Sequence, residues 1–219
     1  MTDEDLKAEL TRLEPFEGRV PWPYLDARGL VTTGVGYLLH DVDAMLAMPW
    51  HHLDDGLPAT PDEVRAEYFR VQAMPAGLGA NHYKGALRLL PADIDAEGVR
   101  RLRVFLAGLP GVFPGYDGFP RPAQLALLDL AWNDGLGAPA TATHAATGLR
   151  GWTHLLAACN AVPPNWANRI DDGTPAGACD PMCAAAQCRT ANPNNNPDRQ
   201  KRNDWRSQSF IDAAVAPVP

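Results

Sequence analysis

The chain has 219 residues, enough for one large domain or for two small lobes that share a connecting helix. Its composition, 46% apolar and 21% charged, is that of an ordinary globular protein, and no apolar run approaches the roughly 18 residues that span a bilayer. The formal net charge of −7 argues against nucleic acid as the main partner, because phosphate binding needs clustered Lys and Arg. A local basic face is still expected where the sequence places Arg199, Lys201, Arg202 and Arg206.

The first quarter of the chain predicts a helix followed by a small antiparallel sheet. Residues 2–14 form a helical pattern that Thr2 can cap, with acidic residues in its first turn, and Pro15 is expected to end or kink it. Residues 20–39 are rich in β-favouring side chains punctuated by glycines, and the stretch from Asp26 to Gly29 predicts a turn between two strands.

The next segments predict short helices and a connector. A short helix is expected at 41–48, and Thr60-Pro61-Asp62-Glu63 is a strong helix start, with an N-cap threonine, a proline at the first helical position and a glutamate two residues later. That helix is expected to continue to about Met74. Residues 75–91 are a glycine-containing connector, with a short helix expected near 82–89.

The remainder of the chain is predicted to be mostly helical. Helices are expected at 95–109, 122–134, 149–161 and 198–214, with a turn-rich break at 110–122 and a loop at 162–197. The predicted class is α+β in a single domain: an N-lobe at about 1–60, a connecting helix at about 60–74, and a helical C-lobe at about 75–219 that carries an insert at 167–196.

Four cysteines, at positions 159, 179, 183 and 188, fall in or beside this insert. An even number in a loop-like segment favours two disulfides, with free thiols and a four-cysteine zinc site as alternatives. The spacing fits no common zinc module. The polar run of His51, His52, Asp54 and Asp55 is interpreted as solvated rather than as a metal site, so no metal and no cofactor is predicted.

Residues that suit sugar chemistry gather between positions 17 and 32. Glu17 lies at a predicted helix end, Asp26 in the hairpin turn and Thr32 on the following strand. Cleavage of a glycosidic bond needs one carboxyl group to protonate the leaving oxygen and another to activate water or stabilise positive charge at the anomeric carbon. A helix end that faces a hairpin can hold two acids on opposite sides of a sugar ring, and a threonine hydroxyl can orient the water.

The spacing of these residues resembles that of phage-type lysozymes. The frame E-G-x5-Y-x-D-x2-G-x2-T-x-G-x-G occurs here without a gap, at Glu17, Gly18, Tyr24, Asp26, Gly29, Thr32, Gly34 and Gly36. The segment 123–138 is similar to the family's helix that ends in an aromatic-Asn-x-Gly turn, and 197–202 resembles the start of the family's last helix. The resemblance covers about two-thirds of the chain and is specific in its first forty residues.

The resemblance implies a muramidase that cleaves the β-1,4 bond between N-acetylmuramic acid and N-acetylglucosamine with inversion. Glu17 would be the general acid, and Asp26 with Thr32 would hold the water. Asn133 would bind sugar amide groups, Arg199 would pair with Glu17, and Tyr24 belongs to the same frame. Independently of the resemblance, Trp22 and Trp166 are expected to lie in loops and are candidates for stacking on sugars, with Trp22 kept as a site residue.

Several positions depart from the family pattern. Tyr37 stands where the family usually has histidine, Pro15 lies two residues before the proposed acid, and Arg28 takes a hairpin position that is acidic in some members. The insert at 167–196 has no recognised counterpart. With the acidic N-terminus, which is unlike a secretory signal, these features predict a specialised bacteriolytic enzyme, delivered to the periplasm or cell wall as an antibacterial toxin or as a phage endolysin.

The predicted partners are peptidoglycan and, for a toxin, an immunity protein or a delivery machinery, with no nucleic acid, no membrane and a monomer as the default. Two other functions stay open. A lytic transglycosylase uses one acid and makes anhydro ends, and a non-catalytic carbohydrate-binding module would keep the fold without needing Glu17 or Asp26. Retention of both acids and Thr32 favours hydrolysis.

Overall fold

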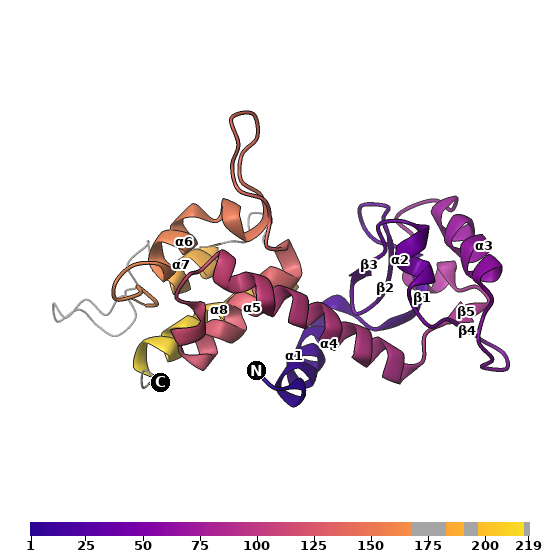
Figure 1. Ribbon diagram of the computed structural model, residues 1–219, viewed down its shortest axis with the longest axis horizontal. Helices are drawn as coiled ribbons and strands as arrows, with labels where there is room; N and C mark the ends of the chain where they lie inside the picture. Colours follow the sequence, from indigo (N-terminus) through magenta and orange to yellow (C-terminus); the bar gives the residue numbers. More distant parts are fainter. Residues whose placement is uncertain (168–182, 191–196, 217–219) are drawn as a thin grey trace. The chain divides into compact units, whose positions relative to one another are not determined.

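The chain divides into two compact units, Met1–Arg101 and Leu102–Pro219, each of which is described by itself. The computed structural model describes residues 1–167, 183–190 and 197–216 (Figure 1). A small antiparallel sheet and mostly helices make up the described chain, which confirms the α+β class. The border between the units falls within α4 (Pro91–Gly108).

The first unit holds all the strands that the structure describes. Helix α1 (Asp3–Glu17) precedes a sheet of β1 (Val20–Leu25), β2 (Val31–Gly34) and β3 (Tyr37–Leu38), in that order and antiparallel throughout. A second, two-stranded sheet pairs β4 (His51–His52) with β5 (Leu87–Arg88). The remaining elements are α2 (Val42–Leu46), α3 (Pro61–Gln72) and the 3-10 turn η1 (Ala80–Tyr83).

Helix α1 begins and ends at residues that suit those positions. Thr2 and Asp5 form a reciprocal capping box, and Leu6, Leu10 and Leu13 are buried along one face. Pro15, which is expected to end or kink the helix, does not end it, because the helix continues to Glu17. A proline in the last turn removes only one backbone hydrogen bond, and Gly18 completes the helix end by donating its N–H to the Glu14 carbonyl at 2.8 Å.

Strand β1 carries two prolines, and its pairing with β2 is irregular. Tyr24 lies opposite Thr32 and Val20 opposite Gly34, with a register shift between the two pairs. Pro21 and Pro23 have no N–H to donate to a ladder, so the shift falls where pairing is weakest. The Pro21 carbonyl instead accepts the N–H of Leu89 at 2.8 Å, which ties β1 to the segment after β5.

Helix α3 follows the predicted start closely. Thr60 and Glu63 form its capping box, and Val64, Tyr68 and Val71 are buried against α2 and the first sheet within the same unit. This packing explains why α3 belongs to the first unit rather than joining two lobes. The helix expected near 82–89 is replaced by η1 and β5, because Leu87 and Arg88 pair with the two histidines of β4.

The second unit is helical. In the part of this unit that the structure describes, α4 is followed by three 3-10 turns and four helices: η2 (Leu109–Gly111), η3 (Tyr116–Gly118), α5 (Arg121–Asp134), η4 (Gly148–Gly151), α6 (Thr153–Cys159), α7 (Ala184–Thr190) and α8 (Pro197–Val215). Helix α8 packs against α5 and α7, and α6 packs against α7. The loop expected at 162–197 is therefore wrong at 184–190, which form α7. Alanine has a high helix propensity, and Ala184 and Ala185 at the start of this helix are buried.

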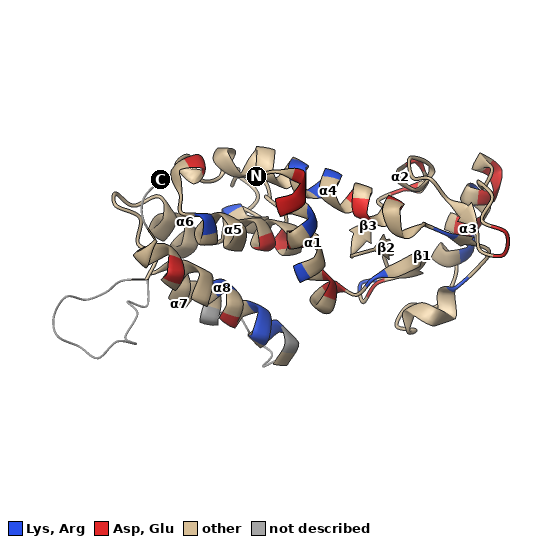
Figure 2. Ribbon diagram, turned by 90° about the horizontal axis from the view of Figure 1, so that it is seen from below, with Lys and Arg blue, Asp and Glu red and all other residues tan. Residues whose placement is uncertain are grey.

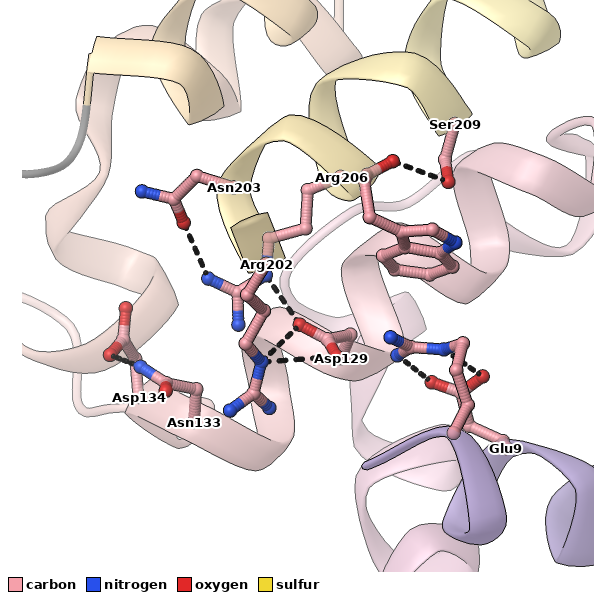
Figure 3. A network of polar contacts seen from close by, with 10 residues as sticks. Glu9, Asp129, Asn133, Asp134, Arg202, Asn203, Arg206 and Ser209 are labelled. Atoms are coloured by element: carbon pink, nitrogen blue, oxygen red, sulfur yellow. Dashed lines mark hydrogen bonds and ion pairs between the residues drawn. The ribbon is translucent and has the colours of Figure 1, made fainter. Parts of the chain in front are cut away.

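A buried charge network joins α5 to α8. Asp129 has no exposed surface, and it accepts hydrogen bonds from the Nε atoms of Arg202, at 3.1 Å, and of Arg206 (Figure 3). Arg206 also donates to the side-chain oxygen of Asn203 at 3.0 Å. The expected basic face is therefore wrong in part: Arg199 and Lys201 are exposed, whereas Arg202 and Arg206 are buried. Figure 2 colours the Lys and Arg positions of α8 blue.

The described residues contain no helix long and apolar enough to cross a membrane. Within the same residues, no three His, Cys, Asp or Glu side chains form a group that could hold a metal ion. Cys159, Cys183 and Cys188 form no disulfide and lie buried in the second unit, so the two-disulfide interpretation is wrong for these three residues as the structure has them. Cys179 lies outside the described residues.

Candidate active site

Glu17 is the last residue of α1, as predicted, and its carboxylate lies over the turn between β2 and β3. A Cβ atom added at Gly36 would come within 3.1 Å of Glu17 Oε2. Gly36 has a φ of +70°, in the left-handed region that favours glycine. The turn therefore needs glycine for its backbone, and the missing side chain leaves room for the Glu17 carboxylate.

Arg19 holds the chain that follows Glu17 against the start of α4. Its guanidinium donates to Asp95 at 2.7 Å and to the Pro91 carbonyl at 2.9 Å, and it forms an ion pair with Glu14. Partial burial lowers the pKa of Arg19, but the hydrogen bonds and charges of the two acids outweigh it and leave the pKa raised. Arg19 stays a cation and fixes the exit of the chain from α1.

Asp26 begins the turn between β1 and β2, as predicted. Its Oδ1 accepts the backbone N–H groups of Arg28 at 2.8 Å and of Leu30 at 2.9 Å, and its backbone carbonyl accepts the N–H of Gly29 at 2.9 Å. The other oxygen, Oδ2, lies 3.5 Å from the Nε of the exposed Arg28. One oxygen thus anchors the carboxylate to the turn, while the other takes no backbone hydrogen bond in this turn.

Thr32 is on β2 and is almost fully buried. Its hydroxyl donates to the Leu30 carbonyl at 3.1 Å, so its oxygen lone pairs are available to accept a hydrogen bond from a water molecule. Because Thr32 lies directly opposite Tyr24 in the β1–β2 pair, both side chains stand on the same face of the sheet.

Tyr24 links the two acids electrostatically. Burial, together with the smaller effects of the charges of Glu17 and then Asp26, raises the pKa of Tyr24 to about 12. Both carboxylates therefore act on the same phenol, which stays protonated and able to donate a hydrogen bond at any pH near neutral. The structure thus brings Glu17, Tyr24, Asp26 and Thr32 together in the first unit.

The other predicted site residues are placed differently. Trp22 lies in β1 rather than in a loop; its Nε1 donates to the Ala80 carbonyl at 2.9 Å, and Lys84 Nζ stands 5.2 Å from the ring centroid. Asn133, exposed near the end of α5, donates to Asp134 at 2.5 Å. Arg199 is exposed in the first turn of α8. The last two belong to the second unit, and their roles in the site stay predictions.

Tyr37, which replaces the family's usual histidine, is a buried support for the sheet. Its hydroxyl donates to the Ile94 carbonyl at 2.8 Å, and the Arg101 guanidinium lies 5.0 Å from its ring centroid. Burial is the main cause of its strongly raised pKa. Gly98 on α4 gives this hydroxyl room, since a Cβ there would come within 2.5 Å of it. The sequence signalled Tyr37 only as a departure from a pattern, and Gly98 carried no signal because the contact is long-range.

Comparison with protein-family models, with curated proteins and with solved structures finds no match for this chain. The assignment of function therefore depends on the geometry of the first unit. Two partly exposed carboxylates and a neutral phenol gather around one hairpin, beside a threonine hydroxyl on the same sheet face as the phenol. Such a set can donate a proton, accept one and orient a water molecule.

Proposed function

We propose that the protein is a peptidoglycan hydrolase with a lysozyme-like fold, a muramidase that cleaves between N-acetylmuramic acid and N-acetylglucosamine. The observation that carries the proposal is the placement of Glu17 beside the Gly36 turn, with Asp26 anchored in the adjoining hairpin and Thr32 on β2. The two acids come from a helix end and a hairpin turn, and both lie near one side chain. The gapless spacing of the motif supports the same assignment.

In this mechanism Glu17 protonates the leaving glycosidic oxygen. Asp26, held by two backbone N–H groups through Oδ1, uses Oδ2 to accept a proton from the attacking water. Thr32 accepts the second hydrogen bond of that water. Inversion requires a separation of roughly 6.5 to 9.5 Å between the carboxyl groups, which leaves space for the water between acid and sugar.

Substrate binding extends the proposal to residues outside this set. Asn133 binds N-acetyl groups, Trp22 stacks on a sugar, and Tyr24 donates to a sugar oxygen. The biological setting that fits is bacteriolysis in the periplasm or cell wall, as a delivered toxin or as an endolysin. A toxin would need an immunity protein in the producing cell.

The test is digestion of purified sacculi by the wild type, by Glu17→Gln and by Glu14→Gln, with mass spectrometry of the released fragments. Glu14 is a matched control, because it lies one turn earlier on α1 and its carboxylate is bound to Arg19. We expect Glu17→Gln to lose activity by about 10²- to 10⁴-fold, the usual contribution of a positioned general acid. Glu14→Gln should retain most of the activity.

The fragments distinguish the competing functions. Reducing N-acetylmuramic acid ends, released by the wild type and by Glu14→Gln, are the expected products. Anhydro ends would reassign the protein to the lytic transglycosylases. If the folded wild type binds sacculi but releases nothing, a carbohydrate-binding module replaces the hydrolase.

A further inference from the structure

Three buried thiols gather in the core of the second unit. Cys159 closes α6 and is 1% exposed, while Cys183 and Cys188, just before and within α7, have no exposed surface. Helices α6 and α7 pack against each other. None of the three thiols has a part in the proposed sugar chemistry.

Cys188 lies on α7, which packs against α6, the helix that ends at Cys159. Burial raises the pKa of Cys159 well above its usual range, and the neighbouring Cys188 contributes to that rise. Burial likewise raises the pKa of Cys188 to about 12, against the opposing charge of Arg206, with smaller contributions from Asp129 and Cys183. Cys188 therefore has two thiol neighbours with which it could pair.

Helix geometry excludes one of these pairs. The Cys183 carbonyl already accepts the N–H of Gln187 at 3.1 Å, so the segment from Cys183 to Cys188 is helical. Five helical steps of about 1.5 Å separate the two Cα atoms by at least about 7.5 Å along the axis. A disulfide needs Cα atoms closer than about 7 Å. Cys183 Sγ also accepts the N–H of Ala186 at 3.4 Å, so it faces its own first turn.

We propose that Cys159 and Cys188 are a redox-active pair that can form a disulfide between α6 and α7. With a small disulfide such as glutathione disulfide as oxidant, one thiolate attacks a sulfur of the oxidant and releases one glutathione thiol. The second thiolate then displaces the remaining glutathione from the mixed disulfide. Two protein thiols are oxidised, one Sγ–Sγ bond forms, and two glutathione thiols leave with the two protons.

Burial decides when this reaction happens. Protonated, inaccessible thiols react slowly, so the folded reduced chain resists oxidation at neutral pH. A chain that folds in an oxidising compartment meets the oxidant before its core closes and can acquire the bond. The redox state of the pair would thus depend on the compartment in which the chain folded. This inference does not depend on the proposed hydrolase function.

The disulfide would also stabilise the second unit. It closes a covalent loop from residue 159 to residue 188, which restricts the unfolded chain. From the loop length we expect the melting temperature to rise on the order of 5–10 °C relative to the reduced protein.

The experiment is to unfold the reduced full-length chain, refold it in a glutathione redox buffer and digest it without reduction. Mass spectrometry then identifies cross-linked peptides, and thermal unfolding is recorded with and without dithiothreitol. Unfolding first removes burial as a barrier to reaction. Cys183→Ala and Cys179→Ala are the controls, and both should keep the cross-link and the shift in melting temperature.

We expect one dominant linked peptide pair, Cys159 with Cys188, and a higher melting temperature that dithiothreitol abolishes. Cys188→Ala should lose both the linked peptides and the rise in melting temperature, whereas Cys183→Ala and Cys179→Ala should keep both, which shows that the effect is specific to the proposed pair. The proposal is overturned if refolding gives no linkage, if the dominant linkage involves Cys179 or Cys183, or if the Cys159–Cys188 linkage lowers the melting temperature.

Discussion

The two units hold their acidic residues in opposite ways. In the first unit, Glu17 and Asp26 lie at a helix end and in a turn, partly exposed, and backbone N–H groups hold Asp26 in place. In the second unit, Asp129 is fully buried between the guanidinium groups of Arg202 and Arg206 (Figure 3). Carboxylates are thus accessible to solvent in the first unit, whereas a carboxylate is part of the packed core in the second.

The difference shows which carboxylates can take part in catalysis. An acid that exchanges protons with substrate and water must be reachable, and its position must be fixed by groups that do not consume both of its oxygens. Asp129 meets neither condition, because both of its oxygens accept hydrogen bonds from arginine and none of its surface is exposed. It is a structural charge, and its removal should affect folding first.

Asp129→Ala should have the largest effect on stability. It leaves Arg202 and Arg206 in the core without their shared anion, a change that typically lowers the free energy of unfolding by about 3–5 kcal/mol. Urea unfolding followed by circular dichroism measures it. Asp212→Ala on α8 is the control, since that exposed carboxylate accepts only the side-chain amide of Gln208, and it should change stability by less than about 0.5 kcal/mol. Equal losses in the two variants would contradict the contrast between buried and exposed acids.

Gly36→Ala should have the next largest effect, on activity more than on stability. The added methyl group would stand 3.1 Å from Glu17 Oε2 and shift the carboxylate by a few tenths of an ångström, so we expect a loss of activity below the roughly 10²-fold that a displacement of about 1 Å can cost. Initial rates on sacculi and the melting temperature are measured together.

Gly29→Ala is the matched control for that change. Gly29 has a φ of +76°, close to the +70° of Gly36, so both substitutions place alanine in a left-handed conformation that costs about 1–2 kcal/mol. At Gly29, however, the nearest atom to an added Cβ is the Ala76 Cβ at 3.6 Å. For Gly29→Ala we expect a similar fall in melting temperature but a much smaller loss of activity than for Gly36→Ala. Equal losses of activity in Gly36→Ala and Gly29→Ala would contradict the idea that Gly36 leaves room for the Glu17 carboxylate.

The sequence predicted the parts of the first unit that local signals determine. A capping threonine starts α1, a turn residue followed by glycine makes the hairpin, and β-branched residues continue it, so Glu17, Asp26 and Thr32 were placed on the correct elements. All these signals operate within a few residues of one another. The α+β class followed from the same local patterns.

Features that depend on distant partners were not predictable in this way. The two-residue strands β4 and β5 are too short to show a pattern, and each is defined by the other across 35 residues or so. The basic run of the last helix gave no sign that Arg202 and Arg206 turn inward, because burial depends on Asp129, some 73 residues earlier. An aspartate in the middle of the most apolar predicted helix was the one available hint.

The smallest expected effect concerns Glu63, an exposed acid that offers the sharpest contrast with Asp129. Glu63 closes the capping box of α3: its carboxylate accepts hydrogen bonds from the backbone N–H of Thr60 at 2.8 Å and from the Thr60 hydroxyl at 2.7 Å. These two bonds lower the pKa of Glu63, and His52 adds to the effect. A lowered folded-state pKa means that the ionised carboxylate stabilises the fold.

The sign of the pH dependence follows. The contribution of the Glu63 charge is fully present above the ordinary pKa of a glutamate and is lost as the pH falls through the lowered pKa of the folded state. Glu63→Gln should therefore melt slightly below the wild type at pH 7, and the difference should shrink toward zero by about pH 3. Asp62→Asn, beside it and 94% exposed, is the control and should show a smaller difference at pH 7. If the difference in melting temperature between the wild type and Glu63→Gln persisted at pH 3, the cap would act through the shape of the side chain rather than its charge. The charge of this exposed acid would then not contribute to folding, in contrast to the buried charge of Asp129.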